Sequence, residues 1–236
     1  MGCRQAFLKY CSMFDSTNEG NIGPVADALL TAVGVGFAPA CPASSLNVRS
    51  VNKGHLFVGS VLLDESGMEN HPLTPMRDAN LVRVLSCQTN GTVVLVLYAV
   101  VEQGRAVIRG AMTAPAEQGW RYAVLDAVNY VHLVAVGEAA TAHALITGGS
   151  GVAMGLPANF RRVGRLPEPA DPGAPPTSAG VATVLAGSCS HATLGQRDFA
   201  RACRCSISTL LWFPKRRPLR PARSIGRPSG LAQHQS

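Results

Sequence analysis

The sequence lacks several features that would assign it to a well-known class of protein. Its longest apolar run, residues 92–101, covers about ten residues, whereas a membrane-spanning helix needs about 20. The start, MGCRQAFLKY, does not have the basic, apolar and small-residue order of a signal peptide. The seven cysteines include no CxxC pair, so the spacing of zinc ligands is also missing. We therefore expect a cytoplasmic protein whose cysteines are reduced and packed in the core.

Charged residues are scarce, at 15% of the chain, and they are unevenly distributed. The formal net charge is +7, but residues 197–236 contain nine basic residues and one acid, which gives this segment +8. The rest has 12 basic and 13 acidic residues and carries −1. A chain of this charge would ordinarily suggest a nucleic-acid or anionic-membrane partner, but the basic character belongs to the tail alone, so we expect no membrane partner and do not expect a nucleic-acid partner. Two explanations of the tail stay open, a disordered basic segment and an aberrant, frameshifted terminus.

The first 163 residues alternate short apolar runs with helix-like segments. The apolar runs show little polar alternation, which is typical of parallel strands covered on both faces. The pattern predicts an α/β fold, with a mostly parallel sheet and flanking helices. The expected strands are residues 6–11, 51–58, 93–98, 122–125, 144–147 and 181–186. The expected helices are residues 24–33, 79–87, 104–113, 131–142 and 151–160, the first of them ended by Gly34.

A change in composition marks the end of this region. Residues 164–180, GRLPEPADPGAPPTSAG, are rich in proline, glycine and alanine, which predicts a linker between domains. Residues 181–196, VATVLAGSCSHATLGQ, read as a strand, a turn and the start of a helix, and so as the start of a second α/β domain. From residue 197 onward the sequence has no usable periodicity.

Three polar turns follow expected strands. The first, residues 9–24, reads KYCSMFDSTNEGNIGP and has more polar residues than a plain turn needs. The second is Gly148–Gly151 and the third is Gly187–Ser190. Glycine lets backbone N–H groups approach an anion, and a following helix start adds partial positive charge. Such turns line the ligand crevice of open α/β sheets, although a glycine-rich turn with a serine N-cap explains each one alone.

Other candidate residues lie outside these turns. His55 and His71 flank a long polar loop and could transfer protons or orient a ligand, or be structural. Asp126 ends an apolar strand and could face the crevice or cap the next segment. The HExxH and GxSxG patterns are absent, which argues against a zinc peptidase and an α/β-hydrolase. We expect no metal site formed by residues of this chain.

Five blocks, in this order, resemble the four-carbon acid sugar kinases. They are KYCSMFDSTNEGNIGPVADALL, GHLFVGSVLLDESGMENHPLTPMRDANLVRVL, YAVLDAV, GGSGVAMGLP and LAGSCSHATLGQ, which fall within residues 4–196. The resemblance implies a sugar-acid-binding domain over residues 1–163 and the start of an ATP-binding domain over residues 181–196. It further implies ATP- and Mg²⁺-dependent phosphorylation of the terminal hydroxyl of 3-oxo-tetronate, with D-threonate and D-erythronate as alternative substrates.

The resemblance also implies roles for individual residues. Asp15 is the expected catalytic residue, which contacts the hydroxyl or acts as its base, and Ser188 or Ser190 is expected to contact ATP. The expected substrate-binding residues are Lys9, Ser16, Thr17, Asn21, His55, Gly149 and Ser150. Small-molecule partners are therefore expected, without a membrane partner.

The sequence also departs from the family pattern. The opening Asp-Asp-Phe-Thr-Gly and Lys-x-Arg-Ser blocks are missing, and SSLNVRSV at residues 44–51 stands where the family has Pro-Glu-Asn-Gly-Arg. The glycine-rich Gly-Glu-Thr-Ser segment of the ATP domain is missing after residue 196. We therefore expect a fragment with weak acid binding and no kinase activity. The rival interpretations are a non-catalytic sugar-acid-binding remnant and a basic-tailed nucleic-acid binder.

Overall fold

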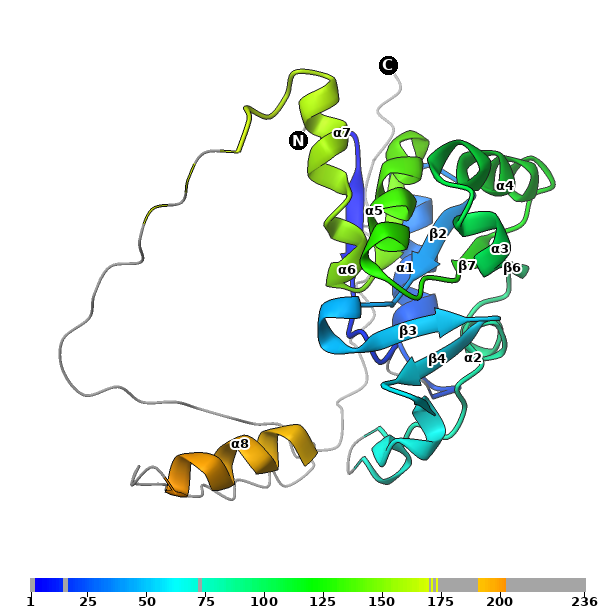
Figure 1. Ribbon diagram of the computed structural model, residues 1–236. Coiled ribbons are helices and arrows are strands. Elements are labelled where there is room, and N and C mark those ends of the chain that lie inside the picture. The colour runs from blue at the N-terminus through cyan, green and yellow to red at the C-terminus, as the bar shows by residue number, and fades with distance from the viewer. Residues whose placement is uncertain are drawn as a thin grey trace, which may run out of the picture. The chain divides into compact units, whose positions relative to one another are not determined.

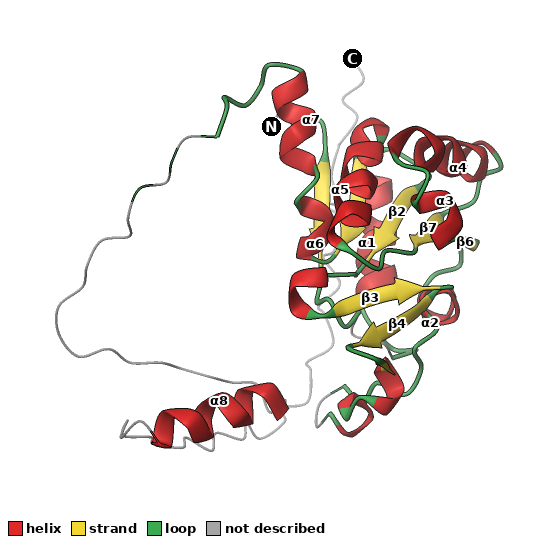
Figure 2. Ribbon diagram, viewed as in Figure 1, coloured by secondary structure: helices red, strands yellow, loops and turns green. Residues whose placement is uncertain are grey.

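The computed structural model describes residues 3–14, 17–71, 74–169, 171, 173 and 191–202, with the backbone alone at His191. The chain divides into two units, residues 1–183 and 184–236, and each is described by itself. Figure 2 shows the alternation of strands and helices in the first unit, which confirms the predicted α/β class.

A five-stranded parallel sheet forms the centre of the first unit. The strands follow the order β1-β8-β2-β7-β6, and every pair of neighbours runs parallel (Figure 1). The three inner strands are buried along their whole length, which explains why they read as apolar runs without alternation. The strands are β1 (Ala6–Lys9), β2 (Ala38–Cys41), β6 (Val93–Val96), β7 (Tyr122–Leu125) and β8 (Leu145–Gly148).

Helices cover both faces of this sheet. Figure 1 shows α1 behind the sheet, where it packs on α2, and α5 in front of it, where α4, α6 and α7 pack around α5. The helices are α1 (Ile22–Val33), α2 (Leu81–Gln88), α3 (Tyr98–Val101), α4 (Arg105–Glu117), α5 (Tyr130–Ala139), α6 (Ser150–Ala153) and α7 (Leu156–Arg162). Helix α1 ends at Gly34 in the left-handed conformation (φ 77°), as the sequence predicts.

A second, smaller sheet corrects the prediction of one strand over residues 51–58. The run folds back on itself as two antiparallel strands joined at Lys53 and Gly54, whose φ angles are 51° and 74°. Two successive left-handed residues form a tight hairpin turn, and Lys-Gly is a weaker signal for it than Asn-Gly. The strands are β3 (Arg49–Asn52), β4 (His55–Val58) and β5 (Val61–Leu62).

Other expected boundaries also differ from the structure. The single helix expected over residues 151–160 is divided into α6 and α7, because the chain turns at Gly155, where an added Cβ would lie 2.4 Å from the Val134 carbonyl oxygen of α5. The strand expected over residues 93–98 stops at Val96, because α3 already begins at Tyr98. Strand β2 was not predicted, since a four-residue run that contains Pro39 is a weak strand signal.

The described part of the second unit is helix α8 (His191–Ala202). It extends through residues 197–202, so the prediction that the irregular tail begins at residue 197 is wrong for these six positions. Asp198 lies within 4 Å of two arginines, and the pair with Arg201 has the i, i+3 spacing that favours a helix. The strand expected at residues 181–186, Ser188, Ser190 and residues 203–236 lie outside the described residues.

Two further expectations concern membranes and cysteines. Among the described residues, no helix combines the length and apolar character that a membrane crossing requires. Cys41 is buried as expected, but Cys3, Cys11 and Cys87 are exposed. The prediction of core cysteines is therefore wrong for these three, whose apolar sequence neighbours do not decide which way each side chain points.

Candidate functional site

The carboxyl ends of the parallel strands bring the predicted polar turns together. Lys9 is the last residue of β1 and lies opposite Gly148, the last residue of β8. The Tyr10 N–H donates to the Gly148 carbonyl at 3.1 Å, which continues the pairing past the strand. The turn after β1 and the Gly148–Gly151 turn therefore lie at neighbouring strand ends, where open α/β sheets usually bind ligands.

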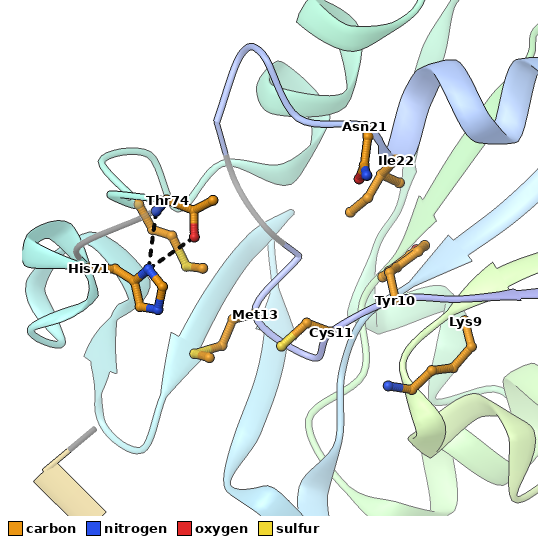
Figure 3. A pocket seen from close by; sticks show the side chains of 9 residues that line it. Lys9, Tyr10, Cys11, Met13, Asn21, Ile22, His71 and Thr74 are labelled. Atoms are coloured by element: carbon orange, nitrogen blue, oxygen red, sulfur yellow. Dashed lines mark hydrogen bonds between the residues drawn. The ribbon is translucent and has the colours of Figure 1, made fainter. Parts of the chain in front are cut away.

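A cavity of about 380 Å³ opens beside the end of β1. Described residues between β1 and the start of α1 form one side, and His71, Thr74 and Met76 form the other (Figure 3). The residues that line it are Lys9, Tyr10, Cys11, Met13, Asn21, Ile22, His71, Thr74 and Met76. The cavity is of the size that holds small-molecule ligands, and it contains Lys9 and Asn21 of the predicted set.

The cavity is basic. Among the described residues that line it, Lys9 carries a full positive charge and none is a carboxylate. Lys9 is exposed, and no acidic side chain of the described residues forms an ion pair with it. Asn21 and Thr74 add an amide and a hydroxyl on the same lining. This arrangement suits a small anion with hydroxyl groups better than an apolar or cationic molecule.

Tyr10 anchors the cavity to the sheet, a role that the sequence did not reveal. The Thr147 hydroxyl donates to the Pro39 carbonyl at 3.0 Å, so the Tyr10 hydroxyl donates to Thr147 Oγ1 at 3.2 Å. Burial raises the pKa of Tyr10 far above its usual value, which keeps the phenol protonated as this donor. Its ring packs edge-on against Phe14, with centroids 5.2 Å apart. Tyr10 thus links the loop after β1 to β8 and β2.

Phe14 holds an unusual backbone conformation directly before the predicted catalytic segment. Its side chain is fully buried, and its φ angle of 62° lies in the left-handed region, which costs a bulky residue about 1–3 kcal/mol. Asp15 and Ser16 follow it and lie outside the described residues, so their assignments stay predictions. Backbone strain of this kind often accompanies functional loops.

Gln88 of α2 fixes the other end of the same loop. Its side-chain amide donates to the Thr17 carbonyl at 2.8 Å, and its oxygen accepts from the Gly23 N–H at 2.9 Å. Thr17 itself lines a neighbouring hollow of about 660 Å³ rather than the Lys9 cavity. The two hollows share Thr74. The structure therefore separates Thr17 from Lys9 and Asn21 within one connected region.

The glycines of the Gly148–Gly151 turn allow close packing. The Gly149 N–H donates to the Cys41 carbonyl at 3.0 Å, and an added Cβ at Gly149 would lie 2.4 Å from the Pro42 carbonyl oxygen. Gly149 thus has a packing role against the loop after β2. Ser150 is exposed at the start of α6. The substrate-binding role of Gly149 and Ser150 stays a prediction.

Asp126 and His55 hold the hairpin in place. Asp126 is fully buried and accepts from the backbone N–H groups of Lys53, Gly54 and Tyr98 at 2.8–2.9 Å. It therefore does not face the crevice, and its role is structural, although it caps the hairpin turn and the start of α3 rather than the segment that follows it. His55 Nδ1 lies 2.9 Å from the Lys53 carbonyl oxygen, and His55 is not part of the cavity lining. His71 does line the cavity, and its Nδ1 accepts from the Thr74 N–H at 3.1 Å.

The described residues do not fit a magnesium ion at the cavity. None of the described lining residues is a carboxylate, and within the described part of the chain no three His, Cys, Asp or Glu side chains gather closely enough to hold a metal. Carboxylate oxygens are the ligands that Mg²⁺ prefers. No step of the chemistry is therefore assigned to a metal here.

The opposite, amino-terminal edge of the sheet carries a closed network around Asp27 of α1. Its carboxylate accepts from Arg121 Nε at 2.6 Å, from the Tyr122 hydroxyl at 2.7 Å and from the Thr89 hydroxyl at 2.8 Å. Partial burial opposes ionisation, but these hydrogen bonds outweigh it and hold the pKa of Asp27 below its usual value. The network ties α1 to the start of β7 and to the end of α2.

Comparisons with known proteins identify the family of the chain. The family described as the sugar-binding N-terminal domain matches residues 1–156. A 3-oxo-tetronate kinase of Burkholderia multivorans is 55% identical over 206 residues, which cover 87% of this chain and 48% of that protein. A 3-oxo-tetronate kinase of Cupriavidus necator is 53% identical over 195 residues, 83% of this chain and 45% of that protein.

A solved structure shows the same fold. The crystal structure of a Salmonella typhimurium LT2 protein superposes with a TM-score of 0.71 at 44% identity, and the match covers 86% of this chain and 47% of that one. The chain thus spans about half the length of the curated relatives it matches. The resemblance seen in the five sequence blocks is confirmed at the level of family and fold.

Proposed function

The chain belongs to the four-carbon acid sugar kinase family, and on this premise we propose that residues 1–163 bind a four-carbon sugar acid in the cavity beside Lys9. The observation that carries the proposal is an exposed lysine in a cavity where no described lining residue is a carboxylate. The Lys9 ammonium binds the carboxylate of the acid. Asn21 and Thr74 bind its hydroxyl groups, and Tyr10 holds this side of the cavity in place.

We propose 3-oxo-tetronate as the acid and ATP as the phosphoryl donor, as the names of the relatives suggest. The terminal hydroxyl oxygen of the acid bonds to the γ-phosphorus of ATP, the bond from that phosphorus to the bridging oxygen breaks, and ADP leaves. Asp15 takes the hydroxyl proton, and Ser188 or Ser190 contacts ATP. Such transfer depends chiefly on positioning and on neutralising charge, for which Mg²⁺ accompanies ATP. We also propose that the protein is located in the cytoplasm.

Isothermal titration calorimetry with a matched pair of lysine variants tests the acid site. Lys9→Met removes the cation of the cavity, and Lys53→Met removes an exposed lysine of the hairpin turn. We expect Lys9→Met to weaken binding of 3-oxo-tetronate or D-erythronate by about tenfold or more, since it removes a charge-assisted contact. Lys53→Met should change the affinity by less than about twofold.

Two outcomes of the titrations would refute the proposed acid site. Equal affinities for the wild type and Lys9→Met would show that the acid binds elsewhere. A wild-type chain that binds neither acid at millimolar concentration would refute acid binding by this chain. Turnover is measured separately, as ADP release from ATP, and any turnover should be lost in Asp15→Asn.

A further inference from the structure

Arg49 lies at the centre of the carboxyl edge, beside the loop that joins β2 to β3. Its backbone N–H donates to the Ser44 carbonyl and its carbonyl accepts from the Ser44 N–H, both at 3.0 Å. Ser44 in turn touches the Gly148–Gly151 turn, since an added Cβ at Gly151 would lie 3.2 Å from the Ser44 Cα. Arg49 is thus fixed next to the turn after β8.

The guanidinium of Arg49 has one edge without an acceptor. Nη1 donates to the Asn47 carbonyl, whereas Nη2 touches only the sulfur of Met13, at 3.9 Å. Nε is buried and has no hydrogen-bond partner. The Nε–H and Nη2–H groups of an arginine point the same way and form the fork that binds a carboxylate or phosphate through two oxygens. In Arg49 this fork holds no oxygen.

Arg83 of the same chain shows what an occupied fork looks like. Its Nε donates to Asp78 Oδ2 and its Nη2 to Asp78 Oδ1, each at 2.6 Å. Arg49 presents the same two nitrogens, but among the described residues no carboxylate forms an ion pair with it. The two arginines thus differ in that Arg83 is paired with a carboxylate of the same chain, whereas Arg49 has no such pair among the described residues.

A second unpartnered group lies in the same loop. The Ser45 hydroxyl oxygen is buried and has no hydrogen-bond partner. A buried polar group left unpaired costs about 1–3 kcal/mol, so such groups are rare in folded proteins. Two of them within residues 45–49 leave the loop with donors that an acceptor outside the protein could use. The fork and the hydroxyl together supply donors for several oxygens of one anion.

Met13 connects this loop to the Lys9 cavity. It lines that cavity, where Figure 3 shows it beside Cys11, and its sulfur touches Arg49 Nη2. Methionine is unbranched and adapts its shape at low cost. Met13 is thus the side chain that lies between the Lys9 cavity and the guanidinium of Arg49.

We propose that the loop between β2 and β3 is a second anion site, in which Arg49 and Ser45 bind the phosphoryl group of a four-carbon acid 4-phosphate. The inference rests on the proposed function, because it places the carboxylate of the same molecule on Lys9. A phosphate monoester carries close to two negative charges and three acceptor oxygens, which match a guanidinium fork and a hydroxyl. The site recognises the product end of the reaction and sets a preference for the phosphorylated acid.

Calorimetric titration with D-erythronate and 4-phospho-D-erythronate tests this directly. The wild type should bind the phosphate ester about tenfold more tightly than the free acid. Arg49→Met should remove this difference while leaving the affinity for the free acid within about twofold. Arg49→Lys keeps the charge but loses the fork, so it should restore only part of the difference. Ser45→Ala should weaken ester binding by about threefold.

Arg105→Met is the matched control, because Arg105 is an exposed arginine at the start of α4. It should change neither affinity by more than about twofold. Thermal unfolding midpoints confirm that each variant is folded, and the free-acid affinity of Arg49→Met serves as a second check.

Four results would overturn the proposal. Equal wild-type affinities for ester and acid would leave no phosphoryl preference to explain. If Arg49→Met weakened both ligands equally, Arg49 would bind the carboxylate instead. An effect of Arg105→Met as large as that of Arg49→Met would indicate general attraction by positive charge. Failure of the wild type to bind either ligand would refute the proposed function as well, and is thereby distinguished from the first three results.

Discussion

The two edges of the central sheet differ in whether their charged side chains have hydrogen-bonded partners. At the amino-terminal edge, the Asp27 carboxylate is bonded to an arginine, a tyrosine and a threonine. At the carboxyl-terminal edge, Lys9 has no acidic partner among the described residues, and the Arg49 fork has no acceptor oxygen. Both edges belong to the same five strands, so the fold alone does not cause the difference.

This contrast separates stability from binding. A paired network stabilises the folded state, and its polar atoms are already bonded and cannot bind a ligand. Unpaired cations at a cavity destabilise the folded state slightly, but they are available to bind an anion. Changes at the amino-terminal edge should therefore affect unfolding without affecting acid binding. Changes of Lys9 should do the reverse.

The largest expected effect on stability comes from Asp27→Asn. This change removes the ion pair with Arg121, and we expect it to lower the free energy of unfolding by about 2 kcal/mol. The loss is smaller than for a fully buried ion pair, because the Asp27 side chain is partly exposed to solvent. Urea unfolding at pH 7 measures it, with Glu117→Gln on the exposed face of α4 as the control. A loss of acid binding in folded Asp27→Asn would contradict the separation of the two edges.

A smaller effect on the free energy of unfolding is expected when the pH is lowered. The pKa of Asp27 is lowered in the folded state by its hydrogen bonds, despite the opposing effect of burial, so its contribution to stability is complete above the unfolded value of about 4. That contribution is lost as pH falls through the lower, folded pKa. The difference in unfolding free energy between wild type and Asp27→Asn should therefore be constant from pH 7 to pH 5 and shrink below pH 4.

Urea titrations of both proteins at several pH values check this expectation. A difference that stayed constant down to pH 2, or that grew on acidification, would show that the Asp27 carboxylate does not stabilise the fold in its charged form. Acid binding is measured at pH 7 and plays no part in this comparison.

The smallest expected effect is a gain in stability at the carboxyl edge. Val48 is exposed and adopts a left-handed conformation with a φ angle of 57°, which is strained for a β-branched residue. Val48→Gly should raise the free energy of unfolding by about 0.5–1 kcal/mol in urea. A decrease would mean that the Val48 side chain stabilises the loop.

The sequence predicts the sheet better than the site, for a physical reason. A buried parallel strand is a continuous apolar run, and residues 122–125 are a strand with the predicted bounds. The hairpin escaped prediction because Lys53 and Gly54 turn the chain inside a run that looks like one strand. The polar loop after β1 was recognised from its composition, and Lys9 and Asn21 do line one cavity.

Other features of the site depend on contacts that no local pattern encodes. Asp126 looked available at a strand end, but three backbone N–H groups from distant segments occupy its oxygens. Arg49 was not singled out by any pattern in the sequence. Its Nε has no hydrogen-bond partner, and the partners of a side chain are seen only in the three-dimensional structure.

Methionine methyl NMR tests most directly whether the acid binds at the carboxyl edge. Met13 and Met76 line the Lys9 cavity, whereas Met112 is fully buried in α4 and serves as an internal reference. The chain labelled with [methyl-¹³C]methionine is titrated with D-erythronate. We predict that the Met13 and Met76 methyl signals shift in proportion to occupancy while the Met112 signal stays in place. Unchanged Met13 and Met76 signals at saturating acid would contradict the proposed site.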